Sequence, residues 1–222
     1  MGLTSEPRVD RSLKGIEKEM QGALGRRERI LKETRDCIAL CSKAIIHIHT
    51  GKAGEAHVEI GDAGKVLAGL REEAGTGPLA RYLASPEAEF VEASSVEAIV
   101  LGRPIPGIKD LGVSGEGYLM GLLDTVGEVK RLLLDAIMRS EIEKARRYFE
   151  LMEGLYSALA PFAAFDHVAG GVRRKIDVAR MLTEDVRGVM AQEARRTEMV
   201  SSMRELEESL GRRAKKGARA AR

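Results

Sequence analysis

The stretch ILKETRDCIALCSKAIIHI, residues 30–48, carries apolar side chains every three or four positions. This spacing places them on one face of an α-helix. They are Ile30, Leu31, Ile38, Leu40, Ala44, Ile45 and Ile48. With Pro7 at its start and Gly51 as a natural stop, the pattern predicts a first helix over residues 7–50. Such a helix is about 60 Å long at 1.5 Å per residue. We therefore expect it to extend past its own subunit's core.

The rest of the chain shows the same helical period. Glycine and proline interrupt the apolar pattern and mark the ends of further helices. We predict these helices over residues 53–73, 79–101, 114–139, 140–162 and 172–210. No segment alternates with the period of a β-strand, aromatic residues make up only 4%, and tryptophan is absent. The sequence therefore predicts an all-α fold, a bundle of six to seven long antiparallel helices in one domain over residues 1–210.

Charge and hydropathy limit the partners and the cellular location that we expect for the protein. The net charge of +2 is too small to indicate a nucleic-acid partner by itself. Residues 211–222 hold six cations and no acid, so we expect a basic, disordered tail that either stays solvated or adds attraction to phosphate. The N-terminus lacks an apolar signal segment, and no apolar run approaches the roughly 18–20 residues of a membrane span. We expect a cytoplasmic protein with no membrane partner.

One pair of acids falls in the predicted helix 79–101. Glu89 and Glu92 share a face with Val96 and Ile99, and an apolar face is where a helix normally packs. Partial burial and mutual repulsion both raise the cost of ionising two carboxylates. A divalent cation removes that cost, because carboxylate oxygens are ligands that Mg²⁺ and Mn²⁺ prefer. The alternative is a pair of acids on an ordinary solvated face.

A second pair of acids falls in the predicted helix 114–139. Asp124 and Glu128 lie four residues apart, about 40° around the helix axis. Gly121 and Gly127 flank them, and glycine leaves room for another backbone or a ligand to approach. We expect these acids to lie on a different face from the core stripe of this helix, and a solvated face is again the alternative. The expected core stripe is Leu119, Leu122, Val126, Val129 and Leu133.

Two other classes of metal site are disfavoured. Cys37 and Cys41 lie one helical turn apart with no histidine at ligand spacing beside them, so we expect reduced thiols rather than a zinc site or a disulfide. A di-iron bundle needs Glu-x-x-His motifs from two helices, and none of the four histidines follows a glutamate by three residues.

Five segments of the sequence resemble the translin/TRAX family. The segment EFVEA at residues 89–93 resembles the family's E-[YF]-V-E-A signature. The segment YLMGLLDTVGEVKR at residues 118–131 resembles its Y-L-x-G-x-x-D-L-T-G-E-L-x-R stretch. Three more segments are similar to further parts of the family pattern: RERILKETRD at 27–36, SKAIIHIH at 42–49 and RRKIDVAR at 173–180. The resemblance spans about residues 25–195, in order.

This resemblance implies an all-α, translin-like subunit of about seven helices and a closed, hollow oligomer, often an octamer. It implies single-stranded nucleic acid as the ligand. The TRAX-like branch of the family contains Mg²⁺-dependent endoribonucleases that use the acids of E-x-V-E and D-x-x-G-E. All four of these positions are acidic here, as Glu89, Glu92, Asp124 and Glu128. One departure is Val126, where the family usually has threonine.

By resemblance, the chain is therefore a TRAX-like, metal-dependent endoribonuclease that acts on single-stranded RNA as a homo-oligomer. The four acids would be both catalytic and metal-binding residues, with Mg²⁺ or Mn²⁺ as the cofactor. A carboxylate that does not bind metal, such as Glu89, could accept the proton of the attacking water. Two alternatives stay open. One is a non-catalytic scaffold that binds single-stranded RNA or DNA, and the other is a purely structural helical assembly.

Binding of a phosphate backbone needs cations near the acids. The candidates are Arg35, Lys43, Lys130 and Arg131, and for each of them pairing with a neighbouring acid is the alternative. Aromatic side chains for base stacking are few, and most of them are expected in the core. We therefore expect recognition of the backbone with little sequence preference.

Overall fold

The chain folds into helices joined by short loops in the computed structural model, which describes the backbone of residues 7–220 and the side chains of residues 7–212. It contains seven α-helices and two 3₁₀ helices, with no β-strand in residues 7–220. They are α1 (Pro7–His49), α2 (Ala53–Ala74), η2 (Pro78–Tyr82), α3 (Ala84–Val100), α4 (Ile108–Leu111), α5 (Gly115–Met138), α6 (Ile142–Leu159), η3 (Ala160–Phe165) and α7 (Val172–Ala220). The predicted all-α fold is confirmed.

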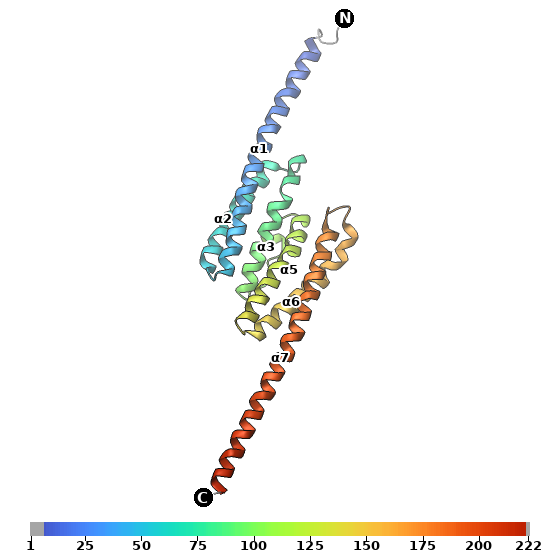
Figure 1. The fold of residues 1–222 in the computed structure, drawn as a ribbon. Helices are drawn as coiled ribbons and strands as arrows, with labels where there is room; N and C mark the ends of the chain where they lie inside the picture. The colour runs from blue at the N-terminus through green and yellow to red at the C-terminus, as the bar shows by residue number, and fades with distance from the viewer. Residues whose placement is uncertain (1–6, 221–222) are drawn as a thin grey trace.

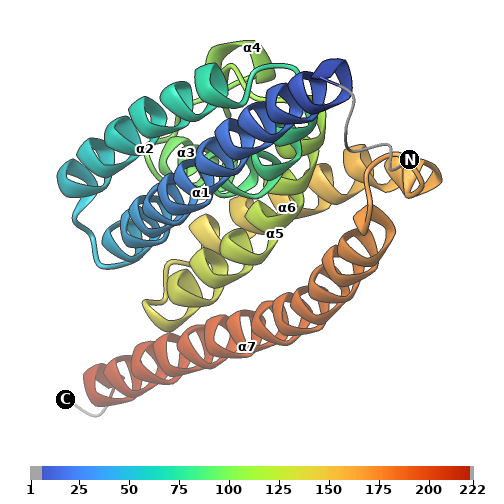
Figure 2. The same cartoon turned by 90° about the horizontal axis from the view of Figure 1, so that it is seen from above.

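The long helices lie side by side in a bundle (Figure 1, Figure 2). α1 packs against α2 and α3, α3 packs against α5, and α5 packs against α6 and α7. The N-terminal part of α1 and the C-terminal part of α7 project from opposite ends of the bundle (Figure 1). The first helix therefore extends past the core, as expected, and the last helix does the same. No helix within residues 7–220 combines the length and the apolar character that crossing a membrane requires.

Two helix boundaries differ from prediction for reasons of local chemistry. The helix predicted from residue 79 begins at Ala84, because Pro86 lacks the N–H that an unbroken helix would use there. The last helix continues to Ala220 instead of ending at residue 210, since its basic segment contains no proline and is rich in helix-forming Ala, Arg and Lys. Residues 211–220 have a helical backbone and residues 221–222 lie outside the described part, so the disordered tail over residues 211–222 stays a prediction.

A third boundary differs at the junction of α5 and α6. The helix predicted from residue 140 begins at Ile142 instead, because Ser140 adopts a left-handed φ of 61°. The Glu141 N–H then bonds back to the Ala136 carbonyl oxygen at 2.8 Å and closes the end of α5. Pro161 marks the change from α6 to the 3₁₀ helix η3, which ends α6 at residue 159 instead of 162.

α5 is the central helix of the bundle. Two residues of its predicted core stripe, Leu119 and Leu122, are only half-buried. Because α3, α6 and α7 all pack against α5, burial extends around the helix and does not follow one stripe. Its buried apolar residues are Met120, Leu123, Val126, Val129, Leu132, Leu133 and Ala136.

α3 and α5 approach so closely that neither Gly117 nor Gly121 of α5 has room for a Cβ atom. A Cβ atom at Gly121 would lie 2.4 Å from the Ala88 carbonyl oxygen and 2.6 Å from Val91 Cβ. Gly127 has no such neighbour, since its Cβ atom would meet only Leu182 Cδ1, at 3.9 Å. Of the two expected roles for these glycines, approach of another backbone is confirmed at Gly121 and not seen at Gly127, where room for a ligand stays a prediction.

Glu87 joins α3 to the start of α5. Its buried carboxylate accepts hydrogen bonds from Arg71 Nε and from the Ser114 backbone N–H, both at 3.0 Å, and the Ser114 hydroxyl also donates to it. Ser114 Oγ accepts in turn from the Gly117 N–H at 3.0 Å and so caps α5. Because these bonds fix the first turn of α5 on α3, they also fix how the later turns of the two helices face each other.

We predict that Gly121→Ala lowers the free energy of unfolding by about 1–3 kcal/mol, because the added methyl group must push α3 and α5 apart. Urea-induced unfolding followed by circular dichroism measures this change. Gly127→Ala is the matched control on the same helix, and it should leave stability unchanged or raise it by up to about 1 kcal/mol. Equal losses in both variants would show that the α3–α5 contact is not tight.

Candidate carboxylate site

The packing of α3 on α5 brings the two predicted acid pairs together. Glu89 and Glu92 belong to α3, Asp124 and Glu128 belong to α5, and all four are half-buried. The charge of Asp124 acts on both α3 acids, and the charge of Glu128 acts on Glu92. These four residues therefore form one group, called here the carboxylate cluster.

Glu92 is the acid in the cluster that ionises least readily. Burial first, and then the negative charges of the other three acids, raise its pKa to about 8 against the opposing charge of the nearby Lys175. Burial, followed by the charge of Asp124, also raises the pKa of Glu89. Glu92 therefore holds a proton at neutral pH, and the cluster carries less negative charge than four free carboxylates would.

Each α5 acid has a cationic or imidazole partner from another helix. Lys175 Nζ of α7 donates to Asp124 Oδ2. His49 Nε2 of α1 lies 2.5 Å from Glu128 Oε2, and this hydrogen bond lowers the pKa of Glu128. His49 Nδ1 also faces Asp135 Oδ2 at 3.7 Å. The α5 half of the cluster is thus partly neutralised by side chains of α1 and α7.

The sequence prediction does not include His49 or Lys175. His49 ends α1 and Lys175 lies in the first turn of α7, so both reach the cluster from helices that carry none of its acids. Their segments, 42–49 and 173–180, are among those that carry the family resemblance. That resemblance is the one signal in the sequence that points to them.

Three of the four predicted phosphate-positioning cations lie in quite different surroundings. Arg131 Nη1 is 3.9 Å from Glu128 Oε2, so this guanidinium lies beside the cluster. Lys130 forms an ion pair with Asp185 of α7 at 3.2 Å. Arg35 is exposed on α1. Of these three, the structure places only Arg131 in contact with a cluster acid.

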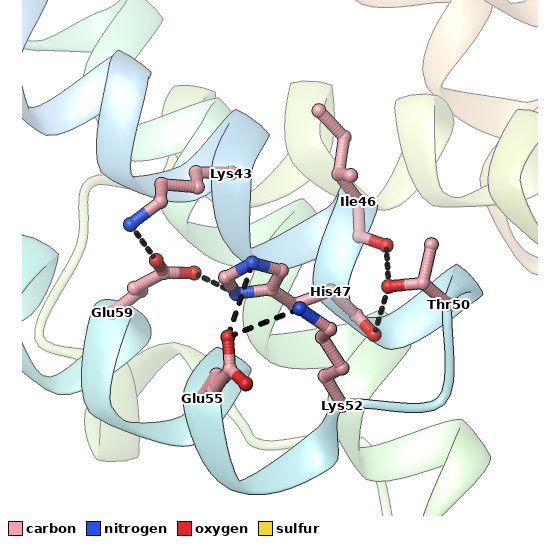
Figure 3. A network of polar contacts seen from close by, with 7 residues as sticks. All are labelled: Lys43, Ile46, His47, Thr50, Lys52, Glu55 and Glu59. Atoms are coloured by element: carbon pink, nitrogen blue, oxygen red, sulfur yellow. Dashed lines mark hydrogen bonds and ion pairs between the residues drawn. The ribbon is translucent and has the colours of Figure 1, made fainter.

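Lys43, the fourth candidate, belongs to a polar network between α1 and α2 (Figure 3). Its Nζ lies 2.5 Å from Glu59 Oε1, and this hydrogen bond raises the pKa of Lys43. The other oxygen of buried Glu59 lies 2.9 Å from His47 Nδ1, and His47 Nε2 lies 3.4 Å from Glu55 Oε2. Lys43 therefore contacts α2 and not the cluster, and its role in nucleic-acid binding stays a prediction.

The two cysteines are free and buried in α1, as expected. Cys41 lies close enough to the cluster for its acids to act on it. A hydrogen bond with Cys37, burial and the charges of Glu89 and Glu92 raise the pKa of the Cys41 thiol. Because the thiolate is the reactive form of cysteine, Cys41 is not a nucleophile for this site.

The chemistry of the cluster suits a divalent cation. Carboxylates are hard oxygen ligands, and neither Glu89 nor Glu92 has a hydrogen-bond partner among the described side chains. In the conformation described, however, no three His, Cys, Asp or Glu side chains of residues 7–212 converge as metal ligands. The Lys175 ammonium supplies positive charge instead. A divalent cation bound here would therefore compete with Lys175 for Asp124.

The comparisons with known proteins agree with this architecture. No family model matches the chain. An uncharacterised protein of Methanocaldococcus jannaschii is 34% identical over 164 residues, which cover 73% of each chain. The crystal structure of AfC3PO is 31% identical with a TM-score of 0.75, covering 83% of this chain and 98% of that one. AfC3PO in complex with duplex RNA is 29% identical over the same coverage, also with a TM-score of 0.75.

The crystal structure of apo-NeC3PO is 20% identical with a TM-score of 0.72, covering 81% of this chain and 96% of that one, and supports the fold alone. Fold and site together define an all-α bundle protein with an acidic site where two of its helices pack. C3PO proteins are of the translin/TRAX type, and the identity to AfC3PO holds over nearly its whole length. The chain belongs to the translin family.

We predict that Glu92→Gln stabilises the protein increasingly as the pH rises from 4.5 to 8. The pKa of Glu92 is about 8 in the fold against a usual 4.5, so the unfolded chain ionises first over this range and native Glu92 lowers the free energy of unfolding. The variant should gain roughly 2–4 kcal/mol at the upper end and almost nothing below the usual pKa. Urea unfolding at several pH values measures it.

Glu150→Gln is the control for this measurement, because Glu150 is exposed on α6. It should follow the wild-type pH dependence. A gain in stability for Glu92→Gln that is the same at low and high pH would contradict the burial of Glu92 as a protonated acid.

Proposed function

We propose that the protein is a metal-dependent endoribonuclease of the TRAX-like type that cuts single-stranded RNA with Mg²⁺ or Mn²⁺. The observation that carries this proposal is the cluster itself, in which four carboxylates from two helices are packed together although burial makes two of them costly to ionise. A fold gains no stability from such an arrangement, and acids with raised pKa values typically mark a functional site.

In this proposal three or four of the acids Glu89, Glu92, Asp124 and Glu128 would hold the cation, and Glu89 is the one that can stay free of it. A bound divalent cation would supply an acidified water and positive charge for the scissile phosphate. Glu89, whose pKa is raised, is suited to accept the proton of the attacking water at a carboxylate oxygen. His49 Nε2 fixes the orientation of Glu128 through its hydrogen bond.

Cationic side chains at the rim of the cluster serve the phosphate backbone. Arg131 is adjacent to Glu128, and Lys175 bonds to Asp124, so both are placed to bind phosphate oxygens of a strand that reaches the acids. RNA as the ligand class is supported by the likeness to AfC3PO, which has been solved as a complex with duplex RNA. Preference for single strands rests on the family resemblance of the sequence.

A second candidate is a scaffold of translin type that binds single-stranded RNA or DNA without cutting it. One observation favours it. Lys175 already neutralises Asp124, and the described side chains do not converge as a ready metal site. In this alternative the cluster is a charge-balanced part of the subunit, and binding relies on the basic side chains alone.

We predict that labelled single-stranded RNA is cut in the presence of Mg²⁺ and not in the presence of a chelator. Glu89→Gln and Asp124→Asn should each lower the cleavage rate by about 100-fold or more, because ligand loss costs more than the 10–100-fold typical of outer-shell changes. Glu150→Gln is the control and should cut like the wild type. Duplex RNA run in parallel decides the strand preference.

A thermal-unfolding measurement gives a second readout. Mg²⁺ should raise the melting temperature of the wild type and not that of the Glu89→Gln/Asp124→Asn double variant. If all proteins bind RNA, none cuts it with Mg²⁺ or Mn²⁺, and neither cation stabilises the fold, the scaffold alternative replaces the nuclease. Absence of RNA binding at low salt would leave a purely structural assembly.

The oligomer is a further part of the proposal. The projecting part of α1 carries a row of exposed apolar residues: Leu13, Ile16, Met20 and Leu24. The projecting part of α7 carries another such row: Met199, Met203, Leu206 and Leu210. Steps of three and four keep each row on one helix face. Other copies of the chain bury these apolar faces in a closed homo-oligomer. The family resemblance suggests that this oligomer is an octamer.

We predict that the wild type forms a species several times larger than the 24.2 kDa chain in light scattering at micromolar concentration. Met20→Glu and Met203→Glu should each reduce the measured mass, because a charge would be buried at a subunit contact. Lys18→Glu places the same side chain on the opposite face of α1 and should leave the mass unchanged. A monomeric wild type would contradict the proposed assembly.

A further inference from the structure

Two adjoining cavities lie at the end of the bundle where α1, α3 and α5 end and α6 begins. The first, of about 550 Å³, is formed by the end of α3, the loop that follows it and one side of α6. The second, of about 670 Å³, is formed by the ends of α1 and α5 and the start of α6. They share Val100, Lys144 and Tyr148, so together they form one groove.

The first cavity is cationic around an apolar floor. Its charged lining residues are Arg103, Lys144 and Arg147, and no acid lines it. Within residues 7–212, neither arginine forms an ion pair, and Lys144 has only an exposed contact with Glu141 at 3.3 Å. Such exposed pairs contribute little, so the cations are available to a ligand. The floor consists of Ile99, Ile105, Tyr148 and Leu151.

The second cavity borders His49, a residue that bonds to the carboxylate cluster. His49 forms part of its wall, and on the other side of the imidazole ring Nε2 lies 2.5 Å from Glu128 Oε2. Its charged lining is mixed, with the cations Arg139 and Lys144 and the acids Asp135 and Glu141. A chain-like anion bound at Arg103 and Arg147 that follows the groove passes Lys144 and Arg139 and reaches His49, the partner of Glu128.

We propose that this groove binds a segment of the RNA strand on its way to the carboxylate cluster. The inference rests on the proposed function for the identity of the ligand. A nucleotide combines a flat ring with apolar faces and an anionic phosphate, which matches an apolar floor edged by cations. Arginine suits both parts, because its guanidinium binds phosphate oxygens in pairs and stacks on aromatic rings. The phosphates contact Arg103 and Arg147, and a base lies against the floor beside Tyr148.

Neighbouring arginines on α6 provide a matched test. Arg147 lines the groove, whereas Arg146, also exposed, does not. Binding of a fluorescent oligouridylate of about twelve nucleotides is measured by anisotropy without divalent cations, so that no cleavage occurs. Arg147→Ala should weaken binding by about 5- to 10-fold and lower the slope of log affinity against log salt by about 0.7. Arg146→Ala should bind within about 2-fold of the wild type.

The outcomes separate this inference from the proposed nuclease activity. If Arg147→Ala and Arg146→Ala bind equally, the groove does not hold RNA, whether or not the wild type cuts it. If Arg147→Ala binds less tightly and the wild type does not cut RNA, the groove stands and the nuclease proposal fails. If Arg147→Ala changes the mass in light scattering and not the RNA affinity, the groove is a subunit contact and the inference is overturned.

Discussion

Where α3 crosses α5, the Ala88 carbonyl oxygen occupies the space that a side chain at position 121 would need. The acids lie immediately beside this contact, since Glu89 follows Ala88 and Asp124 comes one helical turn after Gly121. Close approach of the two backbones therefore brings the carboxylates near enough for their negative charges to repel one another. The same contact that packs the core places four acids where their charges interact.

The subunit limits the electrostatic cost of this arrangement in three ways. A proton stays on Glu92, whose pKa is about 8. An ammonium group from α7 bonds to Asp124, and an imidazole from α1 bonds to Glu128. Each device comes from a different part of the chain, so the charge balance of the cluster depends on the positions of α1 and α7 as well as on α3 and α5. The site is therefore built from four helices, α1, α3, α5 and α7.

The sequence predicts the part of this picture that local spacing governs. Steps of three and four residues give the helices and put Glu89 with Glu92 and Asp124 with Glu128. Spacing cannot supply partners that are distant in the chain, such as His49, which lies 79 residues before Glu128. Spacing also fails to predict which acid each of two adjacent cations contacts.

Lys130 and Arg131 are neighbours in sequence, yet side chains one residue apart point about 100° apart on a helix. One of them therefore pairs with Asp185 of α7, and the other lies beside Glu128. Lys43 contacts α2 for a similar reason, because the packing of two helices decides which acid it meets. The helix boundaries at Ala84 and Ile142 depend on one proline and one left-handed serine, which periodicity does not register.

The projecting ends of α1 and α7 have a consequence for how order is distributed in the chain. Residues 10–22 of α1 are exposed throughout, so no packing within the subunit supports them as a helix. An unsupported helix of this length is marginal in water. The helical content of this segment therefore depends on the surface that packs against it. Where that surface belongs to another copy of the chain, helical content also depends on protein concentration. Amide hydrogen exchange at these ends would then report on assembly, while exchange in α5 reports on the stability of the subunit itself.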